Sequence, residues 1–138
     1  MSNNYLCSSC KGYINVGKHV VFSVTTTKNR RGLLFLSTEL GDYSMVSNPE
    51  FTVNEGERTN FYCPICNARL ACKRHTNLAR VLMIDENDEV YEVLFSEIAG
   101  EKCTFQVVRS DVRIFGEHSK LYREFIEVFR TSHPYRNL

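Results

Sequence analysis

Short runs rich in β-branched and aromatic residues, separated by turn-forming residues, recur along this chain and predict β-strands. In the first half of the sequence, the predicted strands occupy residues 19–27, 33–38, 51–53 and 59–62. Polar or glycine-containing stretches between them, at residues 28–32, 41–49 and 54–56, predict turns. The first half is therefore expected to form short strands with tight connections.

Three cleaner apolar runs follow in the second half, at residues 78–84, 90–95 and 103–108. A polar loop at 85–89 and a glycine at position 100 separate them, which leaves no room for a long parallel crossover. We expect an antiparallel meander here. The runs are almost continuously apolar, which predicts that both faces of this sheet are covered.

Residues 117–130 alone have a strong helical period. Their apolar stripe repeats every fourth residue and consists of Leu121, Phe125 and Phe129, widened by Tyr122, Ile126 and Val128. Pro134 prevents continuation of the helix. We expect this helix to cover the sheet, and binding of a partner is the alternative.

The whole pattern predicts a mainly β (α+β) fold with antiparallel sheets and one C-terminal amphipathic helix. The chain has 138 residues, which is enough for one domain with a hydrophobic core. We expect a single domain over 1–138, with residues 1–76 and 77–138 as possible lobes.

Charge disfavours strong general binding of nucleic acid. The formal net charge is only +1; four metal-bound thiolates and one Zn²⁺ would bring it near −1. Because phosphate neutralisation supplies most of the affinity for nucleic acid, this balance is unfavourable. The charge is uneven, however: residues 1–80 carry ten Lys/Arg and five Asp/Glu, and residues 81–138 carry seven and eleven.

Six cysteines change the picture most, because four of them form two Cys-x-x-Cys pairs. Cys7 and Cys10 form the first pair, and Cys63 and Cys66 form the second. Four thiolates arranged in two such pairs predict a closed tetrahedral Zn²⁺ site, in which backbone N–H groups of each turn point at sulfur. Fifty-two residues lie between Cys10 and Cys63, so the metal would join the start of the chain to its middle. Such a site is structural, because no coordination position is left for a substrate.

Two disulfides or a redox function are the alternatives to zinc. No basic segment followed by an apolar run is seen at the N-terminus, and no apolar stretch approaches the ~20 residues of a membrane span. We therefore expect a reducing cytoplasmic location without membrane association, where paired cysteines serve as metal ligands or redox pairs. Neither pair lies at a clear strand-to-helix junction, which disfavours a thioredoxin-like motif.

Two further positions could extend the metal chemistry. Cys72 and His75 follow the second pair, and either could replace a cysteine ligand or help to bind a second ion. The simpler interpretation is a strand that leaves the metal turn, with Cys72 on its apolar face.

Cys103 is the only candidate nucleophile. It lies in a predicted strand, where a buried apolar thiol is expected. A catalytic role would require a nearby base and a depressed pKa, and no spacing in the sequence identifies the base. Phosphate-binding Gly-rich loops, Gly-x-Ser-x-Gly elbows and His-Glu-x-x-His motifs are absent from the sequence.

Basic residues form two small clusters, one at positions 28–31 and one from Arg69 to His75. Solvated turns are the simpler interpretation. The functional interpretation is an anion-binding or RNA-binding face that contains Arg30, Arg31, Lys73 and Arg74.

Around the cysteine pairs, the chain resembles the zinc-anchored β-tent group, and yippee-like domains in particular. The matching stretches are residues 5–10, 31–36 and 56–70, so the resemblance covers about residues 5–73. The family typically has Gly-Trp after the second pair, where this chain has Ala71 and Cys72, so the family's aromatic ligand cage is not implied. Related methionine sulfoxide reductases share the zinc scaffold, but their Arg-Tyr-Cys signature is missing near Cys103. Residues 78–130 also resemble small bacterial zinc-ribbon proteins of unknown function.

These observations predict a zinc-stabilised binding module. A protein-interaction adaptor is the first expectation and a nucleic-acid-binding zinc-ribbon protein is the alternative. A thiol-dependent enzyme that uses Cys103 is the third.

Overall fold

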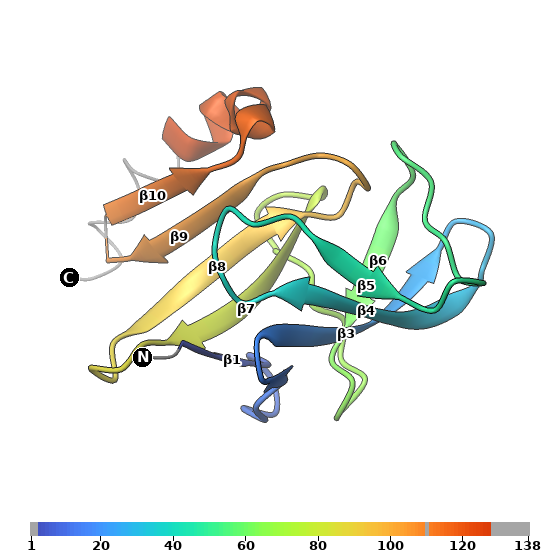
Figure 1. Ribbon diagram of the computed structural model, residues 1–138. Helices are drawn as coiled ribbons and strands as arrows, with labels where there is room; N and C mark the ends of the chain where they lie inside the picture. The colour runs from blue at the N-terminus through green and yellow to red at the C-terminus, as the bar shows by residue number, and fades with distance from the viewer. Residues whose placement is uncertain (1–2, 110, 128–138) are drawn as a thin grey trace.

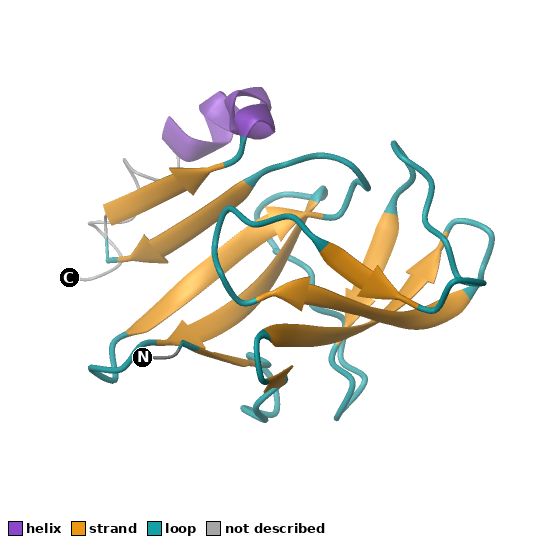
Figure 2. Ribbon diagram, in the orientation of Figure 1, coloured by secondary structure: helices purple, strands orange, loops and turns teal. Residues whose placement is uncertain are grey.

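The computed structural model describes residues 3–109 and 111–127 as two antiparallel five-stranded sheets followed by a short helical segment (Figures 1 and 2). The first sheet has the order β1-β7-β8-β9-β10. Its strands are β1 (Asn4–Leu6), β7 (Leu78–Ile84), β8 (Val90–Ser96), β9 (Thr104–Val108) and β10 (Asp111–Phe115). The predicted meander is therefore confirmed, and it gains one strand at each edge.

The second sheet is built around one long strand. Its strands are β2 (Asn15–Val16), β3 (His19–Thr26), β4 (Arg31–Ser37), β5 (Met45–Ser47) and β6 (Thr59–Tyr62). Strand β4 pairs along one edge of β3, and β5 pairs with β4. Strands β2 and β6 pair with opposite ends of β3, so both lie along its other edge.

Strand β3 shows how the sequence positions this sheet. Val20, Phe22 and Val24 are buried, and the residues between them are more exposed, as expected for a strand with one covered face. The turn to β4 has Asn29 in the left-handed region at φ 62°, which Asn adopts more readily than most residues. The Thr26 side-chain oxygen accepts hydrogen bonds from the backbone N–H groups of Lys28 and Arg30, each at 3.3 Å.

Two hydrophobic cores lie on opposite faces of the first sheet. The inter-sheet core, between the two sheets, includes Tyr5, Phe22, Leu34, Phe61, Val81 and Val93. The helix core, between the first sheet and the C-terminal helical segment, contains Cys72, Leu78, Leu94, Cys103, Phe105, Val107, Tyr122 and Ile126. Neighbouring residues of one strand, such as Val93 and Leu94, belong to different cores. The expectation that both faces are covered is confirmed.

The C-terminal helical segment differs from the expected helix in its type and in its buried face. It begins as a 3₁₀-helix, η1 (Glu117–Tyr122), and continues with α-helical residues to 127. Tyr122 and Ile126 of the predicted stripe are buried and Phe125 packs against the same core, whereas Leu121 is 65 % exposed, so among the described residues of the stripe the prediction is wrong for Leu121. The tight 3₁₀ turns change the angular positions of the residues, which moves the buried face. Residues 128–130 of the expected helix lie outside the described residues.

Other strand predictions also differ from the structure. Residues 51–53 form no strand; instead the Phe51 ring lies against Gly32, where an added Cβ would come within 2.6 Å of it. Strands β1, β2 and β5 have only two or three residues each, too few to show a period. Strand β10 was also missed. Strand β1 pairs with β7, so the first sheet combines residues from both sides of the expected division at 76, and that division remains a prediction.

No helix within residues 3–109 and 111–127 has the length and apolar character needed to span a membrane.

Candidate metal centre

Folding brings the four cysteines of the two Cys-x-x-Cys pairs together. The sulfur atoms of Cys7, Cys10, Cys63 and Cys66 all lie within 4.8 Å of one another. The Cys7 and Cys66 sulfurs are 3.8 Å apart, and those of Cys10 and Cys63 are 3.9 Å apart. Four sulfurs bound tetrahedrally at the usual Zn–S distance would be ~3.8 Å apart. This cluster could therefore hold a metal ion with little rearrangement, and the predicted ligand set lies together as expected.

The first cysteine turn is defined by two backbone hydrogen bonds. The N–H of Lys11 donates to the carbonyl of Cys7 at 2.9 Å, and the N–H of Cys7 donates to the carbonyl of Gly12 at 3.1 Å. Lys11 has φ 61°, in the left-handed region, and this reverses the chain after Cys10.

The second cysteine turn repeats this arrangement. The N–H of Asn67 donates to the carbonyl of Cys63 at 2.9 Å, the N–H of Cys63 donates to the carbonyl of Ala68 at 3.0 Å, and Asn67 has φ 64°. Two segments separated by more than fifty residues thus adopt the same turn. The residue directly after each pair was not singled out from the sequence, although an Asn at that position is a signal for a left-handed residue.

Backbone N–H groups point at the sulfurs, as predicted. The Cys7 sulfur accepts from the N–H groups of Ser9 at 3.3 Å and Cys10 at 3.5 Å. The Cys63 sulfur accepts from those of Ile65 at 3.3 Å and Cys66 at 3.4 Å. Such donors stabilise thiolate charge, so these hydrogen bonds reduce the cost of forming the ionised sulfur that a metal requires.

The cluster has a buried side and an exposed side. Cys7 and Cys63 are buried, whereas Cys10 and Cys66 are exposed. Burial raises the pKa of Cys63 to about 12. Burial also opposes ionisation of Cys7, but backbone N–H groups and the neighbouring thiols outweigh it and lower its pKa. Binding of a cation would therefore displace a proton from Cys63 at neutral pH.

The cluster lies where the chain crosses between the sheets. Cys7 directly follows β1 of the first sheet, and the chain continues from this turn into β2 of the second sheet. Cys63 directly follows β6 of the second sheet, and the chain continues to Ala71, which forms a bridge with Ala79 of β7. Figure 1 shows both turns at the lower edge of the molecule, in blue and green. A bound ion would join the two sheets at both crossings.

Cys72 and His75 do not belong to the metal cluster formed by the described residues. Cys72 is buried in the helix core. The His75 ring packs against Tyr122 and Phe125, with centroid distances of 4.9 and 5.1 Å, and its Nδ1 accepts from the N–H of Asn77 at 3.1 Å. The packing supports the simpler interpretation of Cys72 as a buried apolar residue, but Cys72 lies between β6 and β7 and not in a strand.

Cys103 has the environment of a structural thiol. It is fully buried in the helix core, as expected. Burial raises its pKa to about 12, so the thiol keeps its proton at neutral pH. A nucleophilic cysteine requires the thiolate, and this environment opposes its formation.

The four residues of the expected anion-binding face contact different groups. Arg30 donates to the backbone carbonyl of Glu50 at 2.6 Å. Arg31 lies over the Tyr62 ring, 5.7 Å from its centroid. Arg74 forms an ion pair with Glu92 at 3.4 Å, and Lys73 is exposed. An anion-binding face made of these residues remains a prediction.

Comparison of this chain with known protein families, with curated proteins and with solved structures found no match. The resemblance to yippee-like and zinc-ribbon proteins is therefore an expectation from the sequence alone. The structure shows a mainly β protein whose two sheets meet at a four-cysteine cluster that could hold a metal ion.

Proposed function

We propose that this chain is a zinc-stabilised protein-interaction module. Its Zn²⁺ is bound by Cys7, Cys10, Cys63 and Cys66 and has a structural role. The sulfur cluster at the junction of the two sheets is the observation that supports the metal assignment. Four thiolates in tetrahedral positions suit zinc or iron, and all four ligands come from the protein.

The metal assignment is tested by native mass spectrometry and by absorption spectroscopy. One Zn²⁺ per chain, no disulfide and no visible absorption are expected. A coloured protein would identify iron, and a fully folded metal-free protein with reduced cysteines would contradict the structural role.

An exposed apolar surface on the second sheet supports the interaction role. Directly paired residues of neighbouring strands share a face, and Val21, Phe35 and Val46 form one such row across β3, β4 and β5. Along β3, the residues of this face alternate with the buried residues that point into the inter-sheet core. The face therefore points away from that core. Val46 is 55 % exposed, and Leu33 on the same face is 49 % exposed. We call this row with Leu33 the outer apolar face.

Charge around the outer apolar face indicates what kind of partner would fit. Strands β2 to β6 contain no Asp or Glu, whereas Arg31 and His19 lie on the outer face among the apolar residues. A protein surface with an apolar centre and acidic residues at its margin is complementary to this pattern. Nucleic acid would use the cations without covering the apolar row.

The interaction role is tested by capture of partners with a tagged chain that carries Leu33→Glu and Val46→Glu. A protein captured by wild type should be lost, and the purified partner should bind the variant at least about tenfold more weakly, a difference of ~1.4 kcal/mol. Val90→Glu is the matched control, because Val90 is 47 % exposed but lies on the first sheet. Equal binding by both variants would contradict the proposal.

The same capture assay distinguishes a nucleic-acid partner from a protein partner. Replacement of Arg30, Lys73 and Arg74 by Glu, which leaves Arg31 on the outer apolar face unchanged, should leave a protein partner bound through that face. Retention on RNA or DNA that this replacement abolishes, and that falls steeply between about 50 and 200 mM salt, would instead favour the nucleic-acid alternative.

A further inference from the structure

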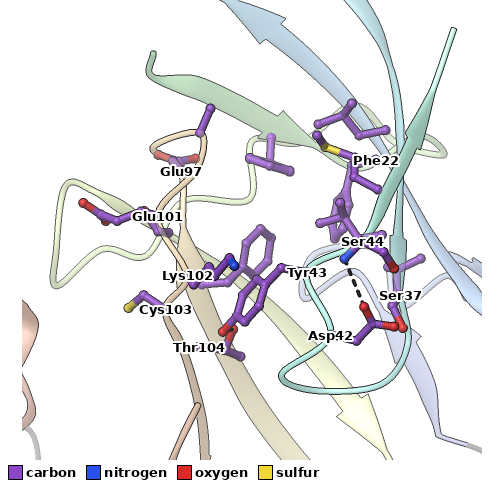
Figure 3. A pocket seen from close by; sticks show the side chains of 18 of the residues that line it. Phe22, Ser37, Asp42, Tyr43, Ser44, Glu97, Glu101, Lys102, Cys103 and Thr104 are labelled. Atoms are coloured by element: carbon purple, nitrogen blue, oxygen red, sulfur yellow. Dashed lines mark hydrogen bonds between the residues drawn. The ribbon is translucent and has the colours of Figure 1, made fainter. Parts of the chain in front are cut away.

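A cavity of about 250 Å³ lies between the two sheets, on the inner side of the sheet that carries the outer apolar face. Figure 3 shows it from close by, with Phe22 contributed by the second sheet and Thr104 by the first. Its volume is somewhat below the ~300–1,000 Å³ typical of drug-sized ligand sites. The cavity therefore suits a molecule with one or two rings.

Apolar side chains form most of the cavity wall. Phe22, Phe61 and Phe95 line it and contact one another, with ring centroids 5.1 to 5.4 Å apart. These rings come from β3, β6 and β8, so both sheets contribute to the wall. Aliphatic residues extend the wall on either side; they include Val20, Leu34, Leu36, Val81 and Val93. An aromatic or aliphatic ring would be well accommodated here.

One ionisable residue in this wall is buried with part of its hydrogen-bonding capacity unused. Glu97 is 1 % exposed. Its Oε1 accepts hydrogen bonds from Arg58 and Arg69, each at 3.2 Å. The backbone N–H of Phe61 also favours the charged carboxyl, but Oε2 completes no hydrogen bond in the described chain. Buried carboxylate oxygens are normally satisfied, because an unsatisfied one loses its hydration without compensation.

A second unsatisfied oxygen belongs to Thr59, whose backbone is hydrogen-bonded to that of Glu97. Thr59 is 2 % exposed and lines the cavity, and its hydroxyl has no hydrogen-bond partner among the described residues. The Thr59 backbone N–H donates to the Glu97 carbonyl at 2.8 Å, and the Glu97 N–H donates to the Asn77 carbonyl at 2.8 Å. The first bond therefore holds Thr59 next to Glu97 in the wall, and the second fixes Glu97 against the segment before β7.

Charge around Glu97 decides what kind of donor would satisfy it. Two guanidinium groups already contact its carboxylate, so this group of three carries a net positive charge. A third cation would be repelled by the two arginines, whereas a neutral N–H or O–H could reach Oε2 without that cost. The other carboxyl and amino side chains that line the cavity are more accessible to solvent, where their charge is screened; they are Glu39, Asp42, Glu101 and Lys102.

The loop before β5 closes one side of the cavity. The Tyr43 hydroxyl lies 2.7 Å from the Thr104 side-chain oxygen, which joins this loop to β9 of the first sheet. Figure 3 shows the Tyr43 ring directed toward Thr104, beside Asp42 and Ser44 at the margin of the cavity. The site is thus formed by both sheets and by a loop that contacts both.

From this arrangement we propose that the cavity binds a small, uncharged, mainly aromatic molecule that donates a hydrogen bond to Oε2 of Glu97, with the Thr59 hydroxyl as second contact. An aromatic amide or a phenol belongs to this chemical class. The site is separate from the outer apolar face, so it is independent of the protein-interaction role.

The test uses three probes of one shape and different chemistry in an NMR titration of the ¹⁵N-labelled, metal-loaded full chain. Benzamide is neutral and has N–H donors, methyl benzoate has no donor, and benzamidine is a cation. Benzamide should shift the backbone amide signals of residues that line the cavity, such as Thr59 and Gly100, and should bind more tightly than the other two probes.

Two variants test the named contacts. Glu97→Gln and Thr59→Val should each weaken benzamide binding, by about tenfold for Glu97→Gln, which removes a charged acceptor. Thr52→Val is the matched control, because Thr52 is exposed and does not line the cavity, and it should leave benzamide binding unchanged. If Glu97→Gln fails to fold, the benzamide affinity of Thr59→Val still tests the proposal, because Val keeps the shape of the Thr side chain and removes only the hydroxyl.

The proposal is overturned by any of three results. These are the absence of shifts at cavity residues with benzamide, equal or tighter binding of methyl benzoate or benzamidine, and benzamide binding that neither variant weakens.

Discussion

The two cores on either side of the first sheet are built in different ways. The inter-sheet core combines residues from Tyr5 to Val93, which are distant along the chain, and the cysteine cluster lies at its edge. The helix core draws on Leu94 to Ile126, with only Cys72 and Leu78 from earlier in the sequence. Contacts between distant segments cost more chain entropy than contacts between near ones. The four-cysteine cluster, which could hold a metal cross-link, thus lies where ordering the chain is most costly, and the core whose contacts are more local contains no such cluster among the described residues.

The largest expected effect comes from removal of the metal. Cys63→Ser should abolish zinc binding and lower the free energy of unfolding by several kcal/mol, which is part of the ~10 kcal/mol or more that zinc contributes in isolated zinc peptides. Hydrogen exchange should show loss of protection in β3 and β6 before β8 and β9. Cys72→Ser, in the helix core, is the control that should keep the zinc. A uniform loss of protection across both sheets would remove the distinction between the two cores.

Truncation of a large side chain in the helix core should have the next largest effect. Phe105 is fully buried, and Phe105→Ala should destabilise the protein by about 3–5 kcal/mol through the cavity that it creates. Denaturant unfolding measures this cost, and mass spectrometry of the folded variant should still show one zinc per chain. Loss of zinc from the folded variant would mean that packing in the helix core and metal binding beside the inter-sheet core depend on each other.

The buried carboxyl of Glu97 should make stability depend on pH. Burial raises the pKa of Glu97, and the charges of Arg69 and Arg58 offset this only in part. Between the ordinary carboxyl pKa and this raised value, the folded protein binds a proton that the unfolded chain has lost. Stability should therefore fall as pH rises through that window, and the loss should persist above it.

Comparison of wild type with Glu97→Gln isolates this dependence. Urea unfolding from about pH 4.5 to 8 should show that wild type loses stability relative to the variant as the pH rises. Parallel curves for the two proteins would show that Glu97 has no raised pKa in the folded state.

The smallest expected effect is the absence of cysteine labelling in the helix core. Cys103 is buried and its pKa is raised to about 12, so iodoacetamide at pH 8 should not modify it in the native protein. Cys10 and Cys66 are exposed and should become labelled once a chelator removes the metal. Rapid labelling of Cys103 in the metal-bound protein would instead support the alternative that this protein is a thiol-dependent enzyme.

The sequence predicted the metal ligands and the central strands because each has a strong local signal. Cys-x-x-Cys spacing identified all four clustered cysteines, and β7 at 78–84 and β6 at 59–62 have the predicted bounds. Strands such as β1 and β5 exist because longer strands pair with them, so their three residues carry little signal of their own. Phe51 was predicted in a strand, but its ring is placed by contact with Gly32.

The cavity could not have been predicted from the sequence, because it depends on how two sheets are spaced. Glu97 follows an apolar strand and has no motif around it, and only folding brings Arg58 and Arg69 to its Oε1. The helix was predicted from its period, but its 3₁₀ geometry buries Tyr122 and leaves Leu121 exposed. Local periodicity thus indicates that a segment is amphipathic without fixing which side chains pack.

The crossing of the chain at each cysteine turn has a consequence for protein synthesis. All four metal ligands have been added once Cys66 is translated, before any residue of β7, the strand with which β1 pairs. At ~5–20 residues per second, the nascent chain has a short interval in which the ligands are complete and the first sheet is not. Metal captured in that interval would hold the start of the chain close to the position that β7 reaches later. If the cluster binds a metal during synthesis, the order of the sequence would let metal binding precede and guide completion of the first sheet.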